Sequence, residues 1–370
     1  MRVGVLGGGQ LGRMLALAGL PLGLQFRFLD PEPSACAADI GELVVGNYED
    51  TSTVDAFLRG VDCVTYEFEN VPVDVARYVA NRVPLYPSPR SLEVAQDRLA
   101  EKTLFQSLGI ATAGFKPVDQ RSELDAALGE IGVPAILKTR RLGYDGKGQM
   151  QIRTLDEADQ AWAELGGQPL ILEERVVFAR ELSILVARGL DGKTAFYPLT
   201  ENHHRDGILR LSLAPAPGIT LDLQNIASRI GHAVLRELDH VGMLAIELFQ
   251  VPGGLMANEI APRVHNSGHW TIEGSVTSQF ENHLRAVLGL PLGDITTIGR
   301  SAMLNFIGAA PATADLASVS GAHLHLYRKT PRPGRKVGHV TLVGTDEAGM
   351  MPKMAAIQRM MASPAEPDSP

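Results

Sequence analysis

A strand-like run that ends in a lysine precedes a glycine-rich loop at residues 135–149, AILKTRRLGYDGKGQ. Lys138 ends the apolar run, and Gly143, Gly146 and Gly148 follow it within one short loop. Glycines let the backbone wrap a ligand, and its N–H groups can then surround phosphate oxygens. A lysine ammonium at the base of the loop adds positive charge for the same phosphates. The stretch therefore predicts a phosphate site, although a flexible surface hairpin can have the same composition.

A second apolar run ends in acidic residues at positions 170–184, LILEERVVFARELSI. A strand that passes through Glu173 and Glu174 to Val176 could present backbone donors and acceptors to a purine edge. Glu181, a little further along, could accept hydrogen bonds from ribose hydroxyls. Acidic residues at the end of a strand are also common on solvated surfaces, so this stretch alone identifies no site.

Two glutamates on a predicted hairpin suit a metal ion. The VPGG at residues 251–254 separates two apolar runs and is a typical hairpin signal. If the hairpin centres on Gly253, Glu247 stands opposite Glu259, with their Cβ atoms about 4.5–5.5 Å apart. Like charges so placed are destabilising unless a cation bridges them, and two carboxylates beside a phosphate site suit Mg²⁺. A register slip of one residue would send the two side chains to opposite faces.

A dense polar cluster follows the hairpin at residues 261–270, APRVHNSGHW. Arg263 offers a guanidinium fork for a carboxylate-like group, and the cluster therefore favours an anion site. His265 and His269 are four residues apart, but a glycine between them argues against a regular zinc-binding helix. For the histidines at 203–204 we likewise expect a polar loop contact rather than a metal site.

The opening residues 3–12, VGVLGGGQLG, have the spacing of a dinucleotide-binding loop. Gly7, Gly9 and Gly12 follow an apolar run and precede a helix-like stretch. Asp30 ends the next apolar run, where an acidic residue can hold a ribose hydroxyl. Taken alone, these residues favour an oxidoreductase that uses NAD. That interpretation leaves the second glycine loop and the hairpin glutamates without a role.

The composition argues against several classes of partner. The chain has 370 residues and a formal net charge of -8, so it has no overall attraction to nucleic acid or anionic lipid. Cys36 and Cys63 are too few for a disulfide framework, and we expect them to be buried free thiols. No run reaches the roughly 18–20 apolar residues that span a membrane. We therefore expect a cytoplasmic protein with neither a nucleic-acid nor a membrane partner.

The order of the predicted elements indicates an α/β region followed by α+β regions. Strands are expected at residues 3–6, 26–29, 43–45 and 63–66, and helices at 11–18, 51–58, 73–80 and 91–108. The predicted organisation is a Rossmann-like domain over 1–100, a small lid domain over 101–178, a larger domain over 179–362 with a small β region from about 300, and a disordered tail over 363–370.

Together these motifs resemble a known family. Several residues follow one another in the order and at the spacing of the nucleotide-binding motifs of the ATP-grasp superfamily. They are Lys138, the GYDGKGQ loop, Glu173 to Val176, Glu181, Glu247 and Glu259. Four further stretches resemble motifs of the N5-carboxyaminoimidazole ribonucleotide synthetases, a family of purine synthesis. These stretches are the opening GGGQLGRM, YEFENV at 66–71, NEIAPRVHNSGHWT at 258–271 and HLYRKTPRPGRKVGHV at 325–340. The resemblance covers nearly the whole chain except its tail.

The resemblance implies an ATP-grasp fold with an N-terminal Rossmann-like pre-ATP-grasp domain, a small lid domain and a C-terminal ATP-grasp domain, commonly as a homodimer. It implies that ATP, bicarbonate and 5-aminoimidazole ribonucleotide give N5-carboxyaminoimidazole ribonucleotide, ADP and phosphate through carboxyphosphate, in de novo purine biosynthesis. It also implies that the first glycine loop faces the ribonucleotide and binds no dinucleotide.

Matched position by position, the resemblance assigns roles to several sets of residues. The implied ATP contacts are Arg98, Lys138, Gly143, Tyr144, Asp145, Gly146, Lys147, Gly148, Gln149, Glu173, Glu174, Arg175, Val176, Glu181, His204, Asn258 and Glu259. The implied Mg²⁺ ligands are Glu247 and Glu259. The implied ribonucleotide contacts are Gln10, Leu11, Glu67 or Glu69, Tyr144 and Asp145, with Lys329, Arg332 and Arg335 as candidates for its 5′-phosphate. The implied catalytic residues are Lys138 for phosphoryl charge, Arg263 for bicarbonate and Asp145 for the amine proton.

Several alternatives stay open at this point. A formate-using ribonucleotide transformylase or a biotin carboxylase would share the fold and the ATP site but take other substrates. A non-catalytic ATP-binding regulatory protein is disfavoured because Lys138 and both predicted metal ligands are present. Many superfamily members have an asparagine two residues after the second metal ligand. Here Ala261 stands at that position, so the role of the asparagine is either absent or filled by Asn258 or Asn266.

Overall fold

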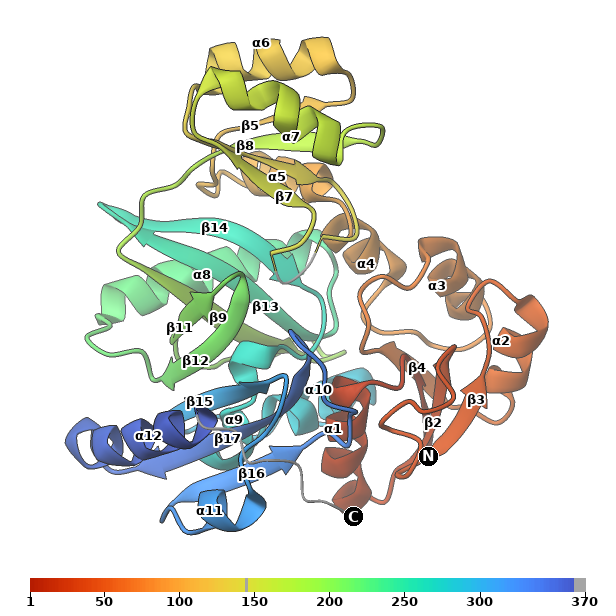
Figure 1. Cartoon of the computed structure of the whole chain (residues 1–370). Coiled ribbons are helices and arrows are strands. Elements are labelled where there is room, and N and C mark those ends of the chain that lie inside the picture. The colour runs from red at the N-terminus through yellow and green to blue at the C-terminus, as the bar shows by residue number, and fades with distance from the viewer. Residues whose placement is uncertain (144–145, 363–370) are drawn as a thin grey trace.

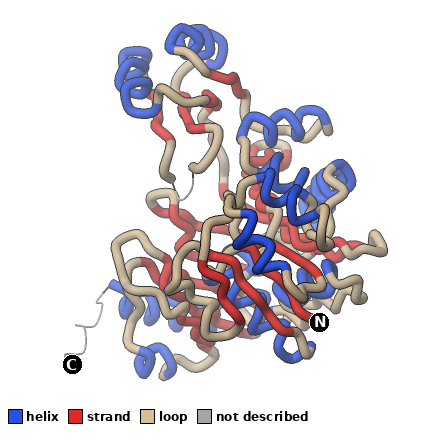
Figure 2. The backbone as a smooth tube through the Cα atoms, turned by 90° about the vertical axis from the view of Figure 1, so that its right-hand side faces the viewer, coloured by secondary structure: helices blue, strands red, loops and turns tan. Residues whose placement is uncertain are grey.

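The computed structural model describes residues 1–143 and 146–362, so Tyr144, Asp145 and the predicted tail lie outside the described part. The described residues form three sheets, each accompanied by helices (Figure 1). Along the chain these sheets belong to an N-terminal domain, a lid and a large C-terminal domain. Figure 2 shows the lid at one end of the molecule, while buried apolar residues join the other two domains in a common core.

The N-terminal sheet is parallel. Its elements are the strands β1 Arg2–Leu6, β2 Gln25–Asp30, β3 Glu42–Val45 and β4 Cys63–Tyr66 and the helices α1 Gln10–Gly19, α2 Thr51–Leu58 and α3 Val73–Ala80. The strand order is β3-β2-β1-β4, and β1 pairs in parallel with both β2 and β4. The predicted elements of this domain are confirmed to within one residue at each end. The ends of β1, β2 and β4 that precede the first loop and its acidic neighbours therefore meet at one edge of the sheet.

The helix predicted over residues 91–108 is two helices, α4 Pro89–Ala95 and α5 Arg98–Ser107. The Asp97 carboxylate accepts hydrogen bonds from two backbone N–H groups in the first turn of α5, at 3.0 and 3.4 Å. These bonds satisfy groups that have no partner inside the helix, as an N-cap does. The prediction of one helix was therefore wrong, because the capping aspartate starts a second helix inside a continuous helical pattern.

The lid is an antiparallel sheet with its own apolar core. Its elements are the strands β5 Phe115–Val118, β6 Ala135–Thr139, β7 Gln149–Ile152 and β8 Leu170–Glu174 and the helices α6 Arg121–Ile131 and α7 Ala158–Leu165. The strand order is β5-β8-β6-β7, and both helices cover the face that points away from the rest of the molecule (Figure 1). The glycine-rich loop joins β6 to β7, so it extends from the lid sheet toward the larger domain.

The large domain is built around one long sheet. Its strands are β9 Arg180–Arg188, β10 Thr194–Phe196, β11 Thr200–Arg205, β12 Ile208–Ala214, β13 Gly242–Val251, β14 Gly254–Ala261, β15 Arg300–Ile307, β16 Ala322–Leu326 and β17 Lys336–Gly344. Its helices are α8 Leu221–Glu237, α9 Thr271–Gly274, α10 Gln279–Val287, α11 Thr313–Ala317 and α12 Glu347–Ala362. The main order is β14-β13-β9-β11-β12-β15-β17-β16, with β10 beside β9. The strands after residue 300 therefore continue the same sheet through the pairing of β12 with β15.

Two expectations from composition concern the whole chain. Cys36 and Cys63 are both buried free thiols, which confirms the prediction for these residues. Within the described ranges, no helix combines the length and the apolar character that crossing a membrane requires.

Candidate active site

A cavity of about 440 Å³ lies between the three domains and brings most of the predicted site residues to one place. The N-terminal domain contributes the start of α1, the lid contributes β6 and the glycine loop, and the large domain contributes its hairpin. The predicted residues in its wall are Gln10, Leu11, Glu69, Arg98, Lys138, Gly143, Gly146, Lys147, Gln149, Glu181, His204, Glu247, Asn258, Glu259 and Arg263. Motifs that are far apart in the sequence thus face one space.

Other predicted residues lie behind or beside this wall. Among the described residues these are Glu67, Gly148, Glu173, Glu174, Arg175, Val176, Lys329, Arg332 and Arg335. Tyr144 and Asp145 lie outside the described residues. The wall also includes Phe178, Asn202, Phe249 and Lys336, which the sequence did not single out. A possible signal for Lys336 was its place in the basic stretch at 325–340, and for Phe178 its place between two acidic positions.

The hairpin glutamates face each other, and a bulge makes this possible. Glu247 on β13 pairs with Glu259 on β14, as predicted. The predicted centre of the hairpin was wrong, however, because Val251 pairs directly with Gly254 across the turn. A register shift after Glu247 inserts Asn258 as an extra residue on β14 and restores the opposition.

The two carboxylates repel each other and fit a divalent cation. Burial raises the pKa of Glu247 to about 8, and the charge of Glu259 adds to this effect. Burial acts in the same direction on Glu259, but the Arg98 guanidinium, 3.0 Å away, together with Lys138 and Lys102, outweighs it and lowers that pKa. The part of the chain that the structure describes has no group of three or more His, Cys, Asp or Glu side chains arranged for a metal. Mg²⁺ suits such a pair, because it commonly takes one or two carboxylates and completes its shell with phosphate oxygens and water.

Lys138 is held by a buried ion pair within the lid. Its ammonium lies 2.8 Å from the carboxylate of Glu173 on the adjacent strand β8. Burial lowers the pKa of Lys138, and the Glu173 charge partly offsets this effect. Burial would raise the pKa of Glu173, but Lys138 and then Lys102 outweigh it and lower the pKa to about 2. The Glu173 Oε1 atom is buried and has no hydrogen-bond partner, so the lysine holds the carboxylate through its other oxygen.

The glycine-rich loop is fixed to the lid at its base. The backbone N–H of Thr139 donates to the carbonyl of Gly148, which closes the loop where β6 ends and β7 begins. Gly146 and Gly148 have φ values of 78° and 68°, a region that residues with a side chain rarely adopt. Asp97 at the start of α5 also accepts hydrogen bonds from Arg140, which follows β6. The base of the loop is therefore rigidly placed over the cavity.

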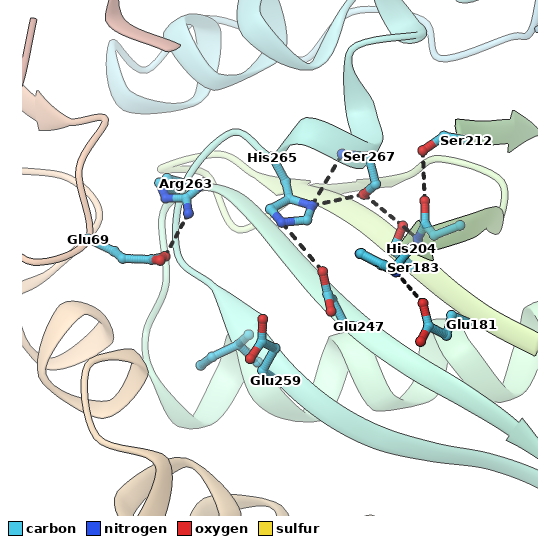
Figure 3. Close-up of polar contacts among 12 residues, drawn as sticks. Glu69, Glu181, Ser183, His204, Ser212, Glu247, Glu259, Arg263, His265 and Ser267 are labelled. Carbon is cyan, nitrogen blue, oxygen red and sulfur yellow. Dashed lines mark hydrogen bonds and ion pairs between the residues drawn. The ribbon is translucent and has the colours of Figure 1, made fainter. Parts of the chain in front are cut away.

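Polar residues of the large domain form the opposite wall (Figure 3). The His204 ring contacts the Glu181 carboxylate. Burial lowers the pKa of His204, but Glu181, Glu247 and Glu259 together outweigh burial and raise this pKa. Arg263 forms an ion pair of 2.8 Å with Glu69 of the N-terminal domain. His265 lies 3.6 Å from Glu247 and hydrogen-bonds Ser267.

The first glycine loop is closed by carboxylates of its own domain. Glu67 accepts hydrogen bonds from the N–H groups of Gly9 at 2.7 Å and of Leu11 and Gly12 at 3.1 Å. Asp30 accepts from the N–H of Gly8 at 2.7 Å. These are the positions where a dinucleotide would need free amides and a ribose acceptor. The interpretation as an NAD site is therefore wrong, and Glu67 is placed against the loop rather than toward the cavity.

The predicted 5′-phosphate residues lie beside this loop. The Lys329 ammonium contacts the side-chain oxygen of Gln10, which lines the cavity. Burial lowers the pKa of Lys329. Arg335 donates to the carbonyl of Thr330 at 3.2 Å, so it shapes the segment that carries Lys329.

The fold and this site define an ATP-grasp protein, and comparisons with known proteins agree. The family model for the ATP-grasp domain matches residues 103–280, that for the ribonucleotide synthetase preATP-grasp domain matches 1–96, and that for the phosphoribosylaminoimidazole carboxylase C-terminal domain matches 301–351. The N5-carboxyaminoimidazole ribonucleotide synthase of Pseudomonas aeruginosa is 52% identical over 98% of this chain and 99% of its own. The chain therefore belongs to the N5-carboxyaminoimidazole ribonucleotide synthase family.

Solved structures give the same result. The N5-carboxyaminoimidazole ribonucleotide synthetase of Thermus thermophilus superposes with a TM-score of 0.94 at 56% identity, and the match covers 100% of both chains. The corresponding synthase of Aspergillus clavatus, solved in complex with ADP and 5-aminoimidazole ribonucleotide, superposes with a TM-score of 0.88 at 32% identity over 97% of this chain and 98% of that one. The predicted ATP-grasp fold with its pre-ATP-grasp domain is thereby confirmed.

Proposed function

We propose that this chain is the ATP-dependent ligase that carboxylates 5-aminoimidazole ribonucleotide with bicarbonate to give N5-carboxyaminoimidazole ribonucleotide, ADP and phosphate, in purine biosynthesis. The observation that carries the proposal is the paired Glu247 and Glu259, which face a lysine and a glycine loop across one cavity. Membership of the family over the full chain supports the choice of substrates.

ATP occupies the space between the lid and the large domain in this proposal. Lys138 and the loop amides face the phosphates, and Glu173 holds the Lys138 ammonium from behind the cavity wall. Glu181, fixed by His204, accepts from ribose hydroxyls. The remaining ATP contacts that we propose are Arg98, Gly143, Gly146, Lys147, Gly148, Gln149, Glu174, Arg175, Val176, Asn258 and Glu259, with Tyr144 and Asp145 from outside the described residues.

Glu247 and Glu259 hold Mg²⁺ in this proposal. The ion supplies positive charge to the phosphates when it is bound. The contribution of the chain is to fix two oxygen ligands on adjacent strands, with the Arg98 guanidinium beside them. Because the repulsion between the carboxylates exists before binding, the site is already shaped for a cation.

The chemical work divides into two transfers. A bicarbonate oxygen, held by Arg263, forms a bond to the γ-phosphorus while the bond to the β–γ bridging oxygen breaks, which gives ADP and carboxyphosphate. Lys138 stabilises the charge on the transferred group. The exocyclic amine of the ribonucleotide then bonds to the carboxyl carbon, phosphate leaves, and the amine loses a proton. We assign the positioning of that proton to Asp145.

The ribonucleotide lies against the N-terminal domain in this proposal. Gln10, Leu11 and Glu69 line that side of the cavity. Lys329, next to Gln10, is the first candidate for the 5′-phosphate, with Arg332 and Arg335 on the same segment. Glu67 acts indirectly, because its carboxylate already supports the loop that carries Gln10.

ADP release tests the proposal directly. We expect MgATP turnover to rise strongly only when bicarbonate and 5-aminoimidazole ribonucleotide are both present. No stimulation by this pair, with activity instead on glycinamide ribonucleotide plus formate or on biotin, would keep the fold and overturn the substrates. Omission of Mg²⁺ should remove the activity. We also propose a homodimer and a cytoplasmic location, which light scattering of the purified chain and cell fractionation would test.

A further inference from the structure

The metal-binding strand β14 lies at the edge of its sheet, yet its outer edge is not free. An edge strand presents backbone groups that have no neighbouring strand to bond. Here the Ala257 N–H donates to the carbonyl of Ala111 at 2.7 Å, and the Thr112 hydroxyl donates to the Ala257 carbonyl at 2.9 Å. Beyond Ala257, side chains of helix α5 take over the role of a neighbouring strand.

Two consecutive residues of α5 bond β14 at the bulge itself. The Lys102 ammonium donates to the carbonyl of Asn258 at 2.9 Å. The Glu101 carboxylate accepts from the N–H of Ile260 at 2.5 Å. These two bonds flank Glu259, whose opposition to Glu247 exists only because Asn258 is an extra residue. Removal of the bulge would shift the register by one residue and turn the metal ligand to the other face.

Lys102 also reaches the lid. Its ammonium lies 3.5 Å from the same Glu173 carboxylate oxygen that Lys138 holds at 2.8 Å. Its side chain is 1% exposed, and a buried cation of this kind is costly unless it is well paired. The acceptors that offset this cost are a lid carboxylate and a carbonyl on the metal strand. One side chain therefore joins two elements that the proposed ATP site requires on opposite sides of the cavity.

We propose that Lys102 is a positioning residue for the nucleotide–metal site. It holds the Asn258 bulge so that Glu259 faces Glu247, and it fixes Glu173 against Lys138 in the lid. It touches neither ATP nor the metal in this role. The inference deepens the proposed function and rests on it, since it assumes that the hairpin glutamates bind Mg²⁺ together with the nucleotide.

Nucleotide binding by the full chain tests the inference without the reaction. ADP affinity is measured by calorimetry with Mg²⁺ and with EDTA, and the ratio of the two gives the metal response. Lys102→Met keeps the length of the side chain but removes the charge and the donor. We expect the metal response to fall by about tenfold or more, as when the support of a metal ligand is removed. ADP affinity in EDTA should fall less, because only the Glu173 contact acts there.

Thr112→Val is the matched control. It removes a bond of the same length to the same strand edge, one residue before the bulge. We expect its metal response to stay within about twofold of the unmodified chain, even if its melting temperature falls. If Lys102 merely stabilised the fold, Lys102→Met would likewise lower the melting temperature and leave the metal response unchanged.

Lys102→Gln guards against misfolding of the methionine variant. Glutamine keeps an N–H donor for the Asn258 carbonyl but loses the charge, so we expect a smaller loss than in Lys102→Met. A wild-type metal response in either folded variant overturns the inference. Failure of the proposed function would look different, because the unmodified chain would then release no ADP with bicarbonate and the ribonucleotide.

Discussion

The two glycine-rich loops of this chain have similar composition but opposite surroundings. The loop at residues 7–12 directs its amides inward, where Asp30 and Glu67 accept their hydrogen bonds. The loop at residues 142–148 contributes Gly143, Gly146 and Lys147 to the wall of the large cavity. The same residue type thus allows a close approach to a carboxylate of the chain in one case and to an open site in the other.

The difference shows what a glycine motif specifies. Glycine permits a sharp backbone path and a close approach, but the neighbouring strands decide what approaches. After β4 the chain places Glu67 under the first loop, where a Cβ on Gly9 would lie 2.6 Å from its carboxylate oxygen. After β6 the chain places Lys138, a cation, beside the second loop. The sign of the adjacent charge therefore separates a self-closed loop from an anion site.

Glu259→Gln should have the largest effect, because it removes one of two charges that we assign to the metal beside the second loop. We expect ATP turnover to fall by about 10²–10³-fold or more, measured as ADP release at saturating substrates. Glu237→Gln, at an exposed ion pair with Arg90, is the control and should stay within about twofold. Near-normal turnover of the folded Glu259 variant would exclude the metal role.

Glu67→Ala should act on the first loop and mainly on stability. Three backbone N–H groups would lose their acceptor, and we expect the free energy of unfolding to fall by about 3 kcal/mol. Urea unfolding monitored by circular dichroism measures this change. Glu67→Gln keeps an acceptor oxygen and should lose about half as much. If Glu67 instead contacts the ribonucleotide directly, both variants will raise the KM for that substrate without a change in stability.

The parallel N-terminal domain could be predicted because each of its strands is a short apolar run bounded by helical patterns. The break between α4 and α5 could not, since Asp97 sits in a helical pattern and only its side-chain bonds reveal the cap. The role of Glu67 was also beyond the sequence, because an acidic residue after a strand can face a ligand or the backbone of its own domain. Local sequence patterns therefore predict helices and strands better than they predict which groups a side chain bonds.

The hairpin also shows that a local sequence pattern does not determine the contacts that an element makes. The opposition of Glu247 and Glu259 was predicted correctly from an incorrect turn, and the bulge at Asn258 compensates. No sequence pattern within residues 247–259 predicts that bulge. Its hydrogen bonds come from Lys102, which lies more than a hundred residues earlier in the chain. The candidate site could be predicted as a set of residue types, but its geometry depends on contacts between domains.

Lys329→Ala tests whether the segment beside the first loop binds the phosphate of the ribonucleotide. We expect the KM for 5-aminoimidazole ribonucleotide to rise by about 10–100-fold, as for the loss of a charged hydrogen bond. The KM for ATP, which we propose binds at the second loop, should stay within about twofold. Arg328→Ala is the matched control, because this neighbouring cation pairs with Asp39 and is 68% exposed. Equal increases in the two KM values would refute the assignment.

Mild acid should remove the stability contributed by two buried histidines of the large domain before it removes the stability contributed by the ion pair of the lid. Burial lowers the pKa of His240 to about 4 and that of His283 to about 3. His283 bonds Thr65 of β4 and the Met243 N–H, so it joins the N-terminal and large domains. Because the unfolded chain binds these protons near pH 6.5, the stability that they contribute is complete above that pH and is lost as the pH falls toward 3–4.

Each histidine should remove about 1.4 kcal/mol per pH unit below 6.5. Because Glu247, whose pKa is raised to about 8, gains stability over the same interval, this loss is measured as the difference between variants in urea unfolding at pH 7.5 and 5.5. Trp162→Phe leaves Trp270 as the fluorescent reporter of the large domain. His283→Gln in this background should make the pH dependence shallower. The lid pair behaves differently, because the pKa of Glu173 is lowered from 4.5 to about 2, so its contribution is complete above about pH 4.5 and is lost as the pH falls from there toward 2. If His283→Gln leaves the pH dependence of this background unchanged, His283 is not held neutral in the folded chain.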